Sequence, residues 1–240
     1  MFQSMTLRYS ILAIATIFAL PVLWSQANAD AQTNTTGYTI PDYTLSPDLK
    51  YGVTVPDADG DDSTNRLVEM KTRKVLAVIQ GETQFSHMTW DDGTPPRWST
   101  DSSLLLWRVE DKWNAATVTA VKLDGDKVAW QLDILLVAQK AILNRTRKAK
   151  PREYEAIKKD HAGWGGAYPD GFAVDVYAGG IGDGPISLPL AVHADLASDT
   201  KGMNLPSDMS AQLDGVVDKE GKFTVTKFCV SRTVPPARKW

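Results

Sequence analysis

Cysteine is almost absent: the 240-residue chain contains one, Cys229. No disulfide can form within the chain, so the fold has to depend on a hydrophobic core. We expect Cys229 to be a buried, inert thiol, because it lies in an apolar, strand-like run and free cysteine is among the most buried residue types. A nucleophilic role would need a histidine close in space, which the sequence does not reveal.

An excess of charge of one sign is also missing. The 26 Lys and Arg residues against 29 Asp and Glu residues give a formal net charge of -3, which excludes a strongly basic nucleic-acid-binding protein. The three histidines lack the spacing of a zinc motif, and no nucleophile elbow, phosphate loop or dinucleotide-binding turn is present. We therefore expect no cofactor and no nucleic-acid partner.

Long apolar runs occur only at the N-terminus. Residues 1–29 have the pattern of a signal peptide, with Arg8 ahead of an apolar segment and an Ala27-Asn28-Ala29 cleavage site. Cleavage there would leave Asp30 as the first residue of a periplasmic or secreted protein without a membrane span. The alternative is an uncleaved anchor, although the apolar segment is short for a bilayer.

Residues 30–131 form a β-rich region of short alternating runs separated by turn residues. The pattern predicts strands over 51–55, 66–70, 75–79, 104–109, 117–123 and 127–131, after a polar lead-in over 30–43. Asp124-Gly125 marks a hairpin turn. Strands at this spacing favour antiparallel pairing.

Residues 132–160 change to a helical period. Leu132, Leu135, Leu136 and Leu143 share one face of a helix expected over 131–148, and Pro151 opens a second helix.

Alternation returns in a C-terminal β region over 161–240. That pattern predicts strands over 172–177, 186–193, 212–217 and 222–228, with a hairpin turn at Glu220-Gly221 and a frayed end. The predicted fold class is mostly β (α+β), with antiparallel strands, a central helical segment and a C-terminal sheet.

A Ser-x-Asp turn occurs twice, 53 residues apart, as Ser46-Pro47-Asp48 and Ser99-Thr100-Asp101. Each copy precedes an apolar strand, and its side chains can cap the backbone amides of the turn. Residues 43–131 resemble the Ser-Pro-Asp-x-Lys blade repeat of TolB-type and WD40-like β-propellers. The resemblance implies blade-like sheets that bind proteins or glycans, and it supplies no catalytic residue. Propellers have about four to eight blades, so an unrelated β-meander with the same turn is the alternative.

Tryptophan is concentrated between residues 90 and 130, where five of the eight lie. Indole faces beside carboxylates suit a glycan or peptide, because carboxylates accept hydroxyl or ammonium protons. The candidate binding residues are Trp90, Asp91, Asp92, Trp98 and Trp113. The alternative is that these indoles fill the space between strands, as we expect for Trp107 within an apolar run.

Two charged clusters complete the candidates. Asp57, Asp59 and Asp61 would suit a hard cation such as calcium, but Asp62 and Val68 break the EF-hand pattern, so we expect a solvated loop and no metal site. The basic cluster lies at the end of the first helix. It consists of Arg145, Arg147, Lys148, Lys150 and Arg152. Cations there complement the helix dipole, and an anionic surface or cell-wall polymer is the alternative partner.

These features predict an exported, non-catalytic binding or accessory protein that recognises a protein or a cell-wall glycan through a tryptophan-rich β surface. The alternative is a secreted hydrolase of glycans or peptides that uses Asp91 or Asp92 as acid or base.

Overall fold

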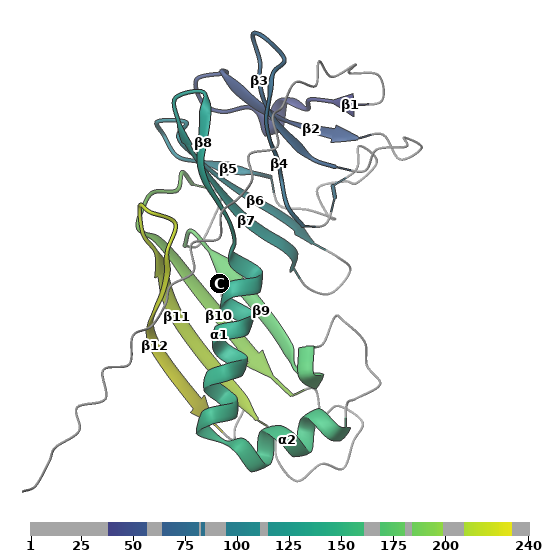
Figure 1. Ribbon diagram of the computed structural model, residues 1–240, viewed down its shortest axis with the longest axis vertical. Coiled ribbons are helices and arrows are strands. Elements are labelled where there is room, and N and C mark those ends of the chain that lie inside the picture. Colours follow the sequence, from purple (N-terminus) through teal and green to yellow (C-terminus); the bar gives the residue numbers. More distant parts are fainter. Residues whose placement is uncertain are drawn as a thin grey trace, which may run out of the picture. The chain divides into compact units, whose positions relative to one another are not determined.

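The computed structural model describes residues 38–56, 64–81, 83–84, 95–110, 115–160, 169–180, 184–198 and 209–231. Every described residue belongs to the compact unit Ala31–Trp240. The described part is mostly β, with three four-stranded antiparallel sheets and two α-helices (Figure 1). The predicted fold class is confirmed. None of the described helices is long and apolar enough to cross a membrane.

Each sheet is a meander in which consecutive strands pair. The N-terminal sheet consists of β1 (Tyr38–Thr39), β2 (Tyr51–Pro56), β3 (Arg66–Glu69) and β4 (Val75–Val78), with a 3-10 turn at Asp42–Thr44. The middle sheet consists of β5 (Arg97–Trp98), β6 (Leu104–Glu110), β7 (Ala115–Asp124) and β8 (Lys127–Asp133). Helices α1 (Ile134–Ala149) and α2 (Pro151–Asp160) follow. A 3-10 turn at Pro169–Gly171 then leads into the C-terminal sheet of β9 (Ala173–Ala178), β10 (Leu190–Ala197), β11 (Ser210–Val217) and β12 (Phe223–Ser231).

The middle sheet is covered on both faces. Leu105 and Trp107 belong to a core shared with the N-terminal sheet, whereas Leu104 and Leu106 belong to a second core shared with α1 and the C-terminal sheet. Successive side chains of a strand point to opposite faces. Burial of both faces therefore explains why β6 is a continuous apolar run rather than an alternating one.

The first helix starts three residues later than the sequence pattern predicts. Leu132 belongs to β8, and Asp133 ends this strand and caps α1, where its Oδ1 accepts a hydrogen bond of 2.8 Å from the amide of Leu136. The buried stripe of α1 is Ile134, Ala138, Ile142 and Thr146. Leu136 is 44% exposed, so the predicted leucine face was wrong in part.

One predicted strand is displaced in the structure, and two short strands were not predicted. The strand expected over 186–193 is β10, Leu190–Ala197. Pro189 has no amide hydrogen to donate to a ladder, so pairing begins only after it. The two-residue strands β1 and β5 were not predicted, because they are too short to show alternation.

The prediction that Cys229 is buried was wrong, since its side chain is exposed. Strand alternation directs Phe228 and Val230 against the C-terminal core, and Cys229 between them faces the opposite way. Both predicted hairpins are confirmed. Gly125 (φ 58°) and Gly221 (φ 78°) occupy the left-handed conformation that glycine tolerates.

The repeated turn has the same geometry in both copies. The Ser46 hydroxyl donates to Asp48 (2.7 Å) and accepts from the amide of Tyr51 (2.9 Å). The Ser99 hydroxyl donates to Asp101 (2.6 Å) and accepts from the amide of Leu104 (2.8 Å). The strand register repeats as well. Tyr51 pairs with Glu69 and, 53 residues later, Leu104 pairs with Lys122. The N-terminal and middle sheets thus share an internal repeat, while the propeller resemblance stays a prediction.

Candidate recognition surface

The face of the C-terminal sheet that points away from α1 is polar. Residues such as Val174, Val192 and Leu213 alternate along the strands and pack in the core with α1. The side chains between them form what we call the polar sheet face. Its residues are Asp175, Tyr177, His193, Asp195, Gln212, Asp214, Lys227 and Cys229.

The strand register arranges these side chains in two rows. One row runs through Tyr177, His193, Asp214 and Lys227, and the other through Asp175, Asp195, Gln212 and Cys229. Directly opposed residues in an antiparallel sheet lie close enough to interact. The rows therefore bring three carboxylates and an imidazole from three strands to one surface.

His193 bridges two of the carboxylates. Its Nδ1 lies 2.6 Å from Asp214 Oδ1, and its Nε2 lies 3.0 Å from Asp195 Oδ2. Gln212 donates to the other oxygen of Asp195 at 2.9 Å and so orients that carboxylate. The hydrogen bond to Asp195 raises the pKa of His193 most, the bond to Asp214 raises it further, and partial burial opposes the shift. An imidazolium that donates from both ring nitrogens fits this arrangement.

Asp175 and Asp195 are a pair of like charges in direct cross-strand register. Burial raises the pKa of Asp175 most, and the charge of Asp195 raises it further, while Arg108 acts in the opposite direction. Like charges directly opposite each other destabilise a sheet. Arg108 on one side and His193, paired with Asp195 at 3.0 Å, offset part of this repulsion.

Arg108, from β6 of the middle sheet, lies beside the polar sheet face. Its Nη1 donates to the carbonyl of Val176 at 2.9 Å, and its Nε is 2.6 Å from Glu110 Oε1. Its guanidinium carbon lies 5.4 Å from the centre of the Tyr177 ring. Arg108 thus joins a cation and an aromatic ring to the edge of the carboxylate cluster.

The geometry suits recognition better than proton transfer. A general base needs a ring nitrogen that can take a proton, and both nitrogens of His193 are held by carboxylates. Within the described ranges, no group of three or more His, Cys, Asp or Glu side chains is arranged to hold a metal ion. The carboxylates of the polar sheet face can instead accept hydrogen bonds from a partner.

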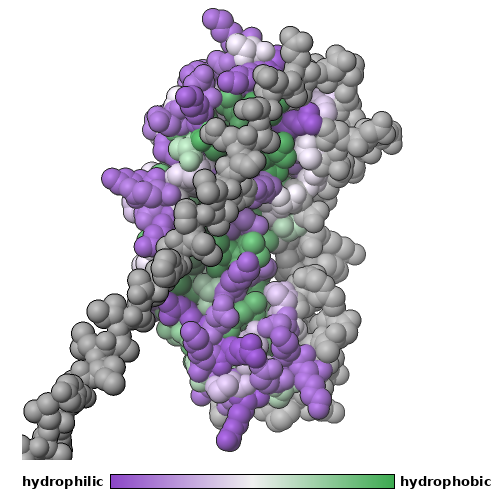
Figure 2. Space-filling model, in the orientation of Figure 1, coloured by the Kyte–Doolittle hydropathy of each residue, from purple (hydrophilic) through white to green (hydrophobic). Residues whose placement is uncertain are grey.

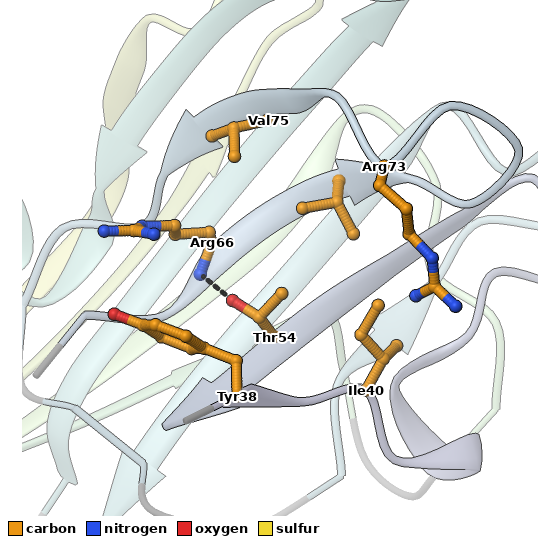
Figure 3. A pocket seen from close by; sticks show the side chains of 7 residues that line it. Tyr38, Ile40, Thr54, Arg66, Arg73 and Val75 are labelled. Atoms are coloured by element: carbon orange, nitrogen blue, oxygen red, sulfur yellow. Dashed lines mark hydrogen bonds between the residues drawn. The ribbon is translucent and has the colours of Figure 1, made fainter. Parts of the chain in front are cut away.

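A separate hollow lies on the N-terminal sheet (Figure 3). It is lined by Tyr38, Ile40, Thr54, Arg66, Val68, Arg73 and Val75. The guanidinium carbon of Arg66 is 4.9 Å from the centre of the Tyr38 ring, and the amide of Arg66 donates to Thr54 Oγ1 at 3.1 Å (Figure 3). Its lining contains no carboxylate or histidine, so this hollow has fewer groups than the polar sheet face that can accept or exchange a proton.

Trp98 is a core residue, which corrects its prediction as a binding residue. Its side chain is 6% exposed, its Nε1 donates to the carbonyl of Thr44 at 3.2 Å, and its ring stacks on Tyr51 at 6.3 Å. The short strand β5 turns this indole into the core with the N-terminal sheet. The other predicted site residues lie outside the described residues. They are Trp90, Asp91, Asp92, Trp113 and the metal candidates Asp57, Asp59 and Asp61.

Sequence reasoning missed the polar sheet face. Its signal is present as polar residues alternating with apolar ones, as in Val-Asp-Val-Tyr over 174–177 and Val-His-Ala-Asp over 192–195. That pattern predicts a half-exposed strand but gives no register. Only strand pairing brings Asp175, His193 and Asp214 together.

Searches of protein-family models, curated proteins and solved structures found no match to this chain.

Proposed function

We propose that the chain is an exported, non-catalytic binding protein and that the polar sheet face recognises a basic segment of a protein partner. Export rests on the signal-peptide pattern of residues 1–29. The observation that carries the proposal is the opposed pair Asp175 and Asp195. A lysine or arginine side chain placed between two carboxylates would relieve their repulsion and form charge-assisted hydrogen bonds.

The same pair predicts opposite effects on binding and stability. Asp175→Asn removes one of two like charges, and the pKa of Asp175 is raised in the folded state. An acid with a raised folded pKa lowers stability at pH values above its unfolded pKa. We therefore expect Asp175→Asn to increase the free energy of unfolding at neutral pH while it weakens binding.

The experiment uses a synthetic lysine- and arginine-rich peptide as the probe. Fluorescence anisotropy should show weaker binding by Asp175→Asn than by the matched control Asp126→Asn, which removes a carboxylate from the exposed β7–β8 turn. Urea unfolding of both variants checks that the fold is retained. Equal affinities for the two variants would refute the proposal. Binding of chitin oligosaccharides in place of the peptide would also overturn it and favour a glycan partner.

The hydrolase alternative has one supporting observation in the same pair. Two neighbouring carboxylates of which one has a raised pKa are the usual composition of an acid–base pair. Under this alternative, the wild type would turn over a peptide or glycan substrate, and Asp175→Asn would abolish turnover. If the wild type turned over a substrate and Asp175→Asn did not, the hydrolase function would replace the non-catalytic proposal.

A further inference from the structure

The junction of α1 and α2 carries a concentration of positive charge. Residues 134–160 contain eight Lys or Arg residues and three Asp or Glu residues, although the whole chain has a net charge of -3. Figure 2 shows hydrophilic side chains gathered over these helices. We define the basic corner as the five cations at this junction. They are Arg145, Arg147, Lys148, Lys150 and Arg152.

Few of these cations have a partner. Arg147 pairs with Glu155 at 2.6 Å, and outside the corner Lys158 pairs with Asp170 at 2.7 Å. No ion pair is found in the described part of the chain for the other four cations of the basic corner. The side chains of Arg145, Lys148 and Arg152 are exposed. Arg145 and Lys148 are three residues apart on one helix, a spacing at which like charges repel.

The helix dipole explains only part of the cluster. Cations are favourable in the last turn of α1, where Arg147 and Lys148 lie. Arg152 lies in the first turn of α2, where the dipole is positive and a cation is unfavourable. Helix stability therefore does not account for the extension of the cluster across Pro151.

The shape of the region indicates an extended ligand. The two helices meet at an angle (Figure 1), and the exposed cations lie on both sides of that junction. A small ligand needs a concave site that surrounds it, whereas charges spread over the end of one helix and the start of the next can contact a broad anionic surface together. Among the described residues, the exposed large hydrophobic side chains are Leu49, Val78 and Leu136, all outside the basic corner. Contact there would be electrostatic and would not insert into an apolar layer.

We propose that the basic corner docks the protein on the surface of a membrane that contains anionic phospholipids. Clusters of four to eight cations on a helix are attracted to anionic headgroups, and each cation contributes separately. The phosphate-bearing headgroups of a bilayer supply a flat array of negative charge that complements the exposed cations Arg145, Lys148 and Arg152. This surface lies on the helical side of the C-terminal sheet, so it is independent of the polar sheet face proposed above.

The test uses the compact unit Ala31–Trp240, which holds every described core residue and omits the apolar N-terminal segment that would itself insert into lipid. Cosedimentation with vesicles of equal parts phosphatidylglycerol and phosphatidylcholine should show binding, and pure phosphatidylcholine vesicles should show none. Raising the salt from about 0.1 M to about 1 M shortens the screening length from about 10 Å to about 3 Å and should release the protein.

The decisive variant is Arg145→Gln with Lys148→Gln, which keeps good helix formers and removes two cations. We expect its partition coefficient for anionic vesicles to fall about thirtyfold. The matched control is Lys71→Gln with Lys74→Gln, which removes two exposed cations from the β3–β4 turn and should leave binding unchanged. Equal losses for both double variants would overturn the proposal, as would binding that does not depend on lipid charge. Tighter binding of double-stranded DNA than of vesicles at the same salt would also overturn it.

Discussion

His193 is a titratable residue whose protonation the fold influences through two carboxylates. Asp195 on its own strand and Asp214 on β11 hold its two ring nitrogens, and Tyr177 is its cross-strand neighbour on β9. Asp175 is the cross-strand neighbour of Asp195, and Lys227 is the cross-strand neighbour of Asp214. The carboxylates raise the pKa of His193 above the ordinary value of 6.5. When protonated, the imidazolium links β10 to β11 through both ring nitrogens.

His193→Gln should flatten the pH dependence of stability. Because the folded pKa of His193 exceeds the unfolded value, the native state binds the proton more tightly. This contribution is complete below a pH of about 6.5 and is lost as the pH rises through the raised folded pKa. Urea unfolding at a series of pH values from about 6 to about 9 should show a steeper decline for the wild type than for the variant. His87 and His161 are present in both proteins, so parallel curves would mean that His193 makes no such contribution.

The repeated Ser-x-Asp turn stabilises the N-terminal and middle sheets in the same way. Ser46 is 1% exposed and Ser99 is 7% exposed, and each hydroxyl both donates to an aspartate and accepts from the first amide of a strand. The two turns also touch, since the amide of Asp48 donates to Ser102 Oγ at 3.2 Å. A hydroxyl removed from either turn leaves a buried amide without its partner.

Ser46→Ala and Ser99→Ala should each lower the free energy of unfolding by about 1–3 kcal/mol, the cost of leaving a buried donor unsatisfied. Similar losses at the two sites are expected because the geometries match. Thr72→Ala is the control, since Thr72 lies in an exposed turn and bonds Glu69 there. Chemical denaturation measures all three. A loss for Thr72→Ala as large as for the serines would argue against a special role of the repeated turn.

The hairpins at Gly125 and Gly221 have the same backbone requirement but different surroundings. A side chain at either position is strained in the left-handed conformation. A Cβ on Gly221 would lie 2.7 Å from Cδ2 of Trp130, whereas a Cβ on Gly125 would meet no atom within 4 Å. The Trp130 indole also donates to the carbonyl of Lys219 at 2.9 Å, which ties β8 to the β11–β12 turn.

Gly125→Ala should cost about 1–2 kcal/mol from backbone strain alone. Gly221→Ala should cost more, because Trp130 must also move. The unfolding midpoints of the two variants in urea provide the comparison. If Gly125→Ala proved the more damaging change, the contact between Gly221 and Trp130 would not constrain the turn.

On the scale of the whole molecule, the middle sheet joins two hydrophobic cores. Leu105 contributes to the core with the N-terminal sheet and Leu106 to the core with α1 and the C-terminal sheet, although they are neighbours in one strand. Loss of either core exposes a face of the same sheet. We therefore expect the described fold to unfold as one cooperative unit.

Leu105→Ala and Leu106→Ala should each destabilise the protein by about 2–5 kcal/mol, as is usual for a large-to-small change in a core. In both variants, the unfolding transitions followed by tryptophan fluorescence and by helical circular dichroism should coincide. Transitions that separate, with the helical signal lost first in Leu106→Ala, would show instead that the two cores unfold independently.

The sequence by itself determined the class of fold and most of its elements. Alternation in 51–55 and 117–123, the helical period after Asp133 and the glycines at 125 and 221 are local signals, and local backbone preferences produce the elements that they predict. The spacing of 53 residues between Ser46 and Ser99 likewise identified a repeat that extends to the strand register. Such features depend on neighbouring residues in the sequence and not on contacts with residues far along the chain.

Tertiary structure alone decided which residues share a surface. Trp98 became a core residue because a two-residue strand turns it toward the N-terminal sheet, and Cys229 became exposed because Phe228 and Val230 took the inward positions of β12. The polar sheet face depends on cross-strand register among residues up to 54 positions apart, from Asp175 to Cys229. Alternation fixes which face a side chain takes within its own strand, but only pairing with other strands fixes its neighbours.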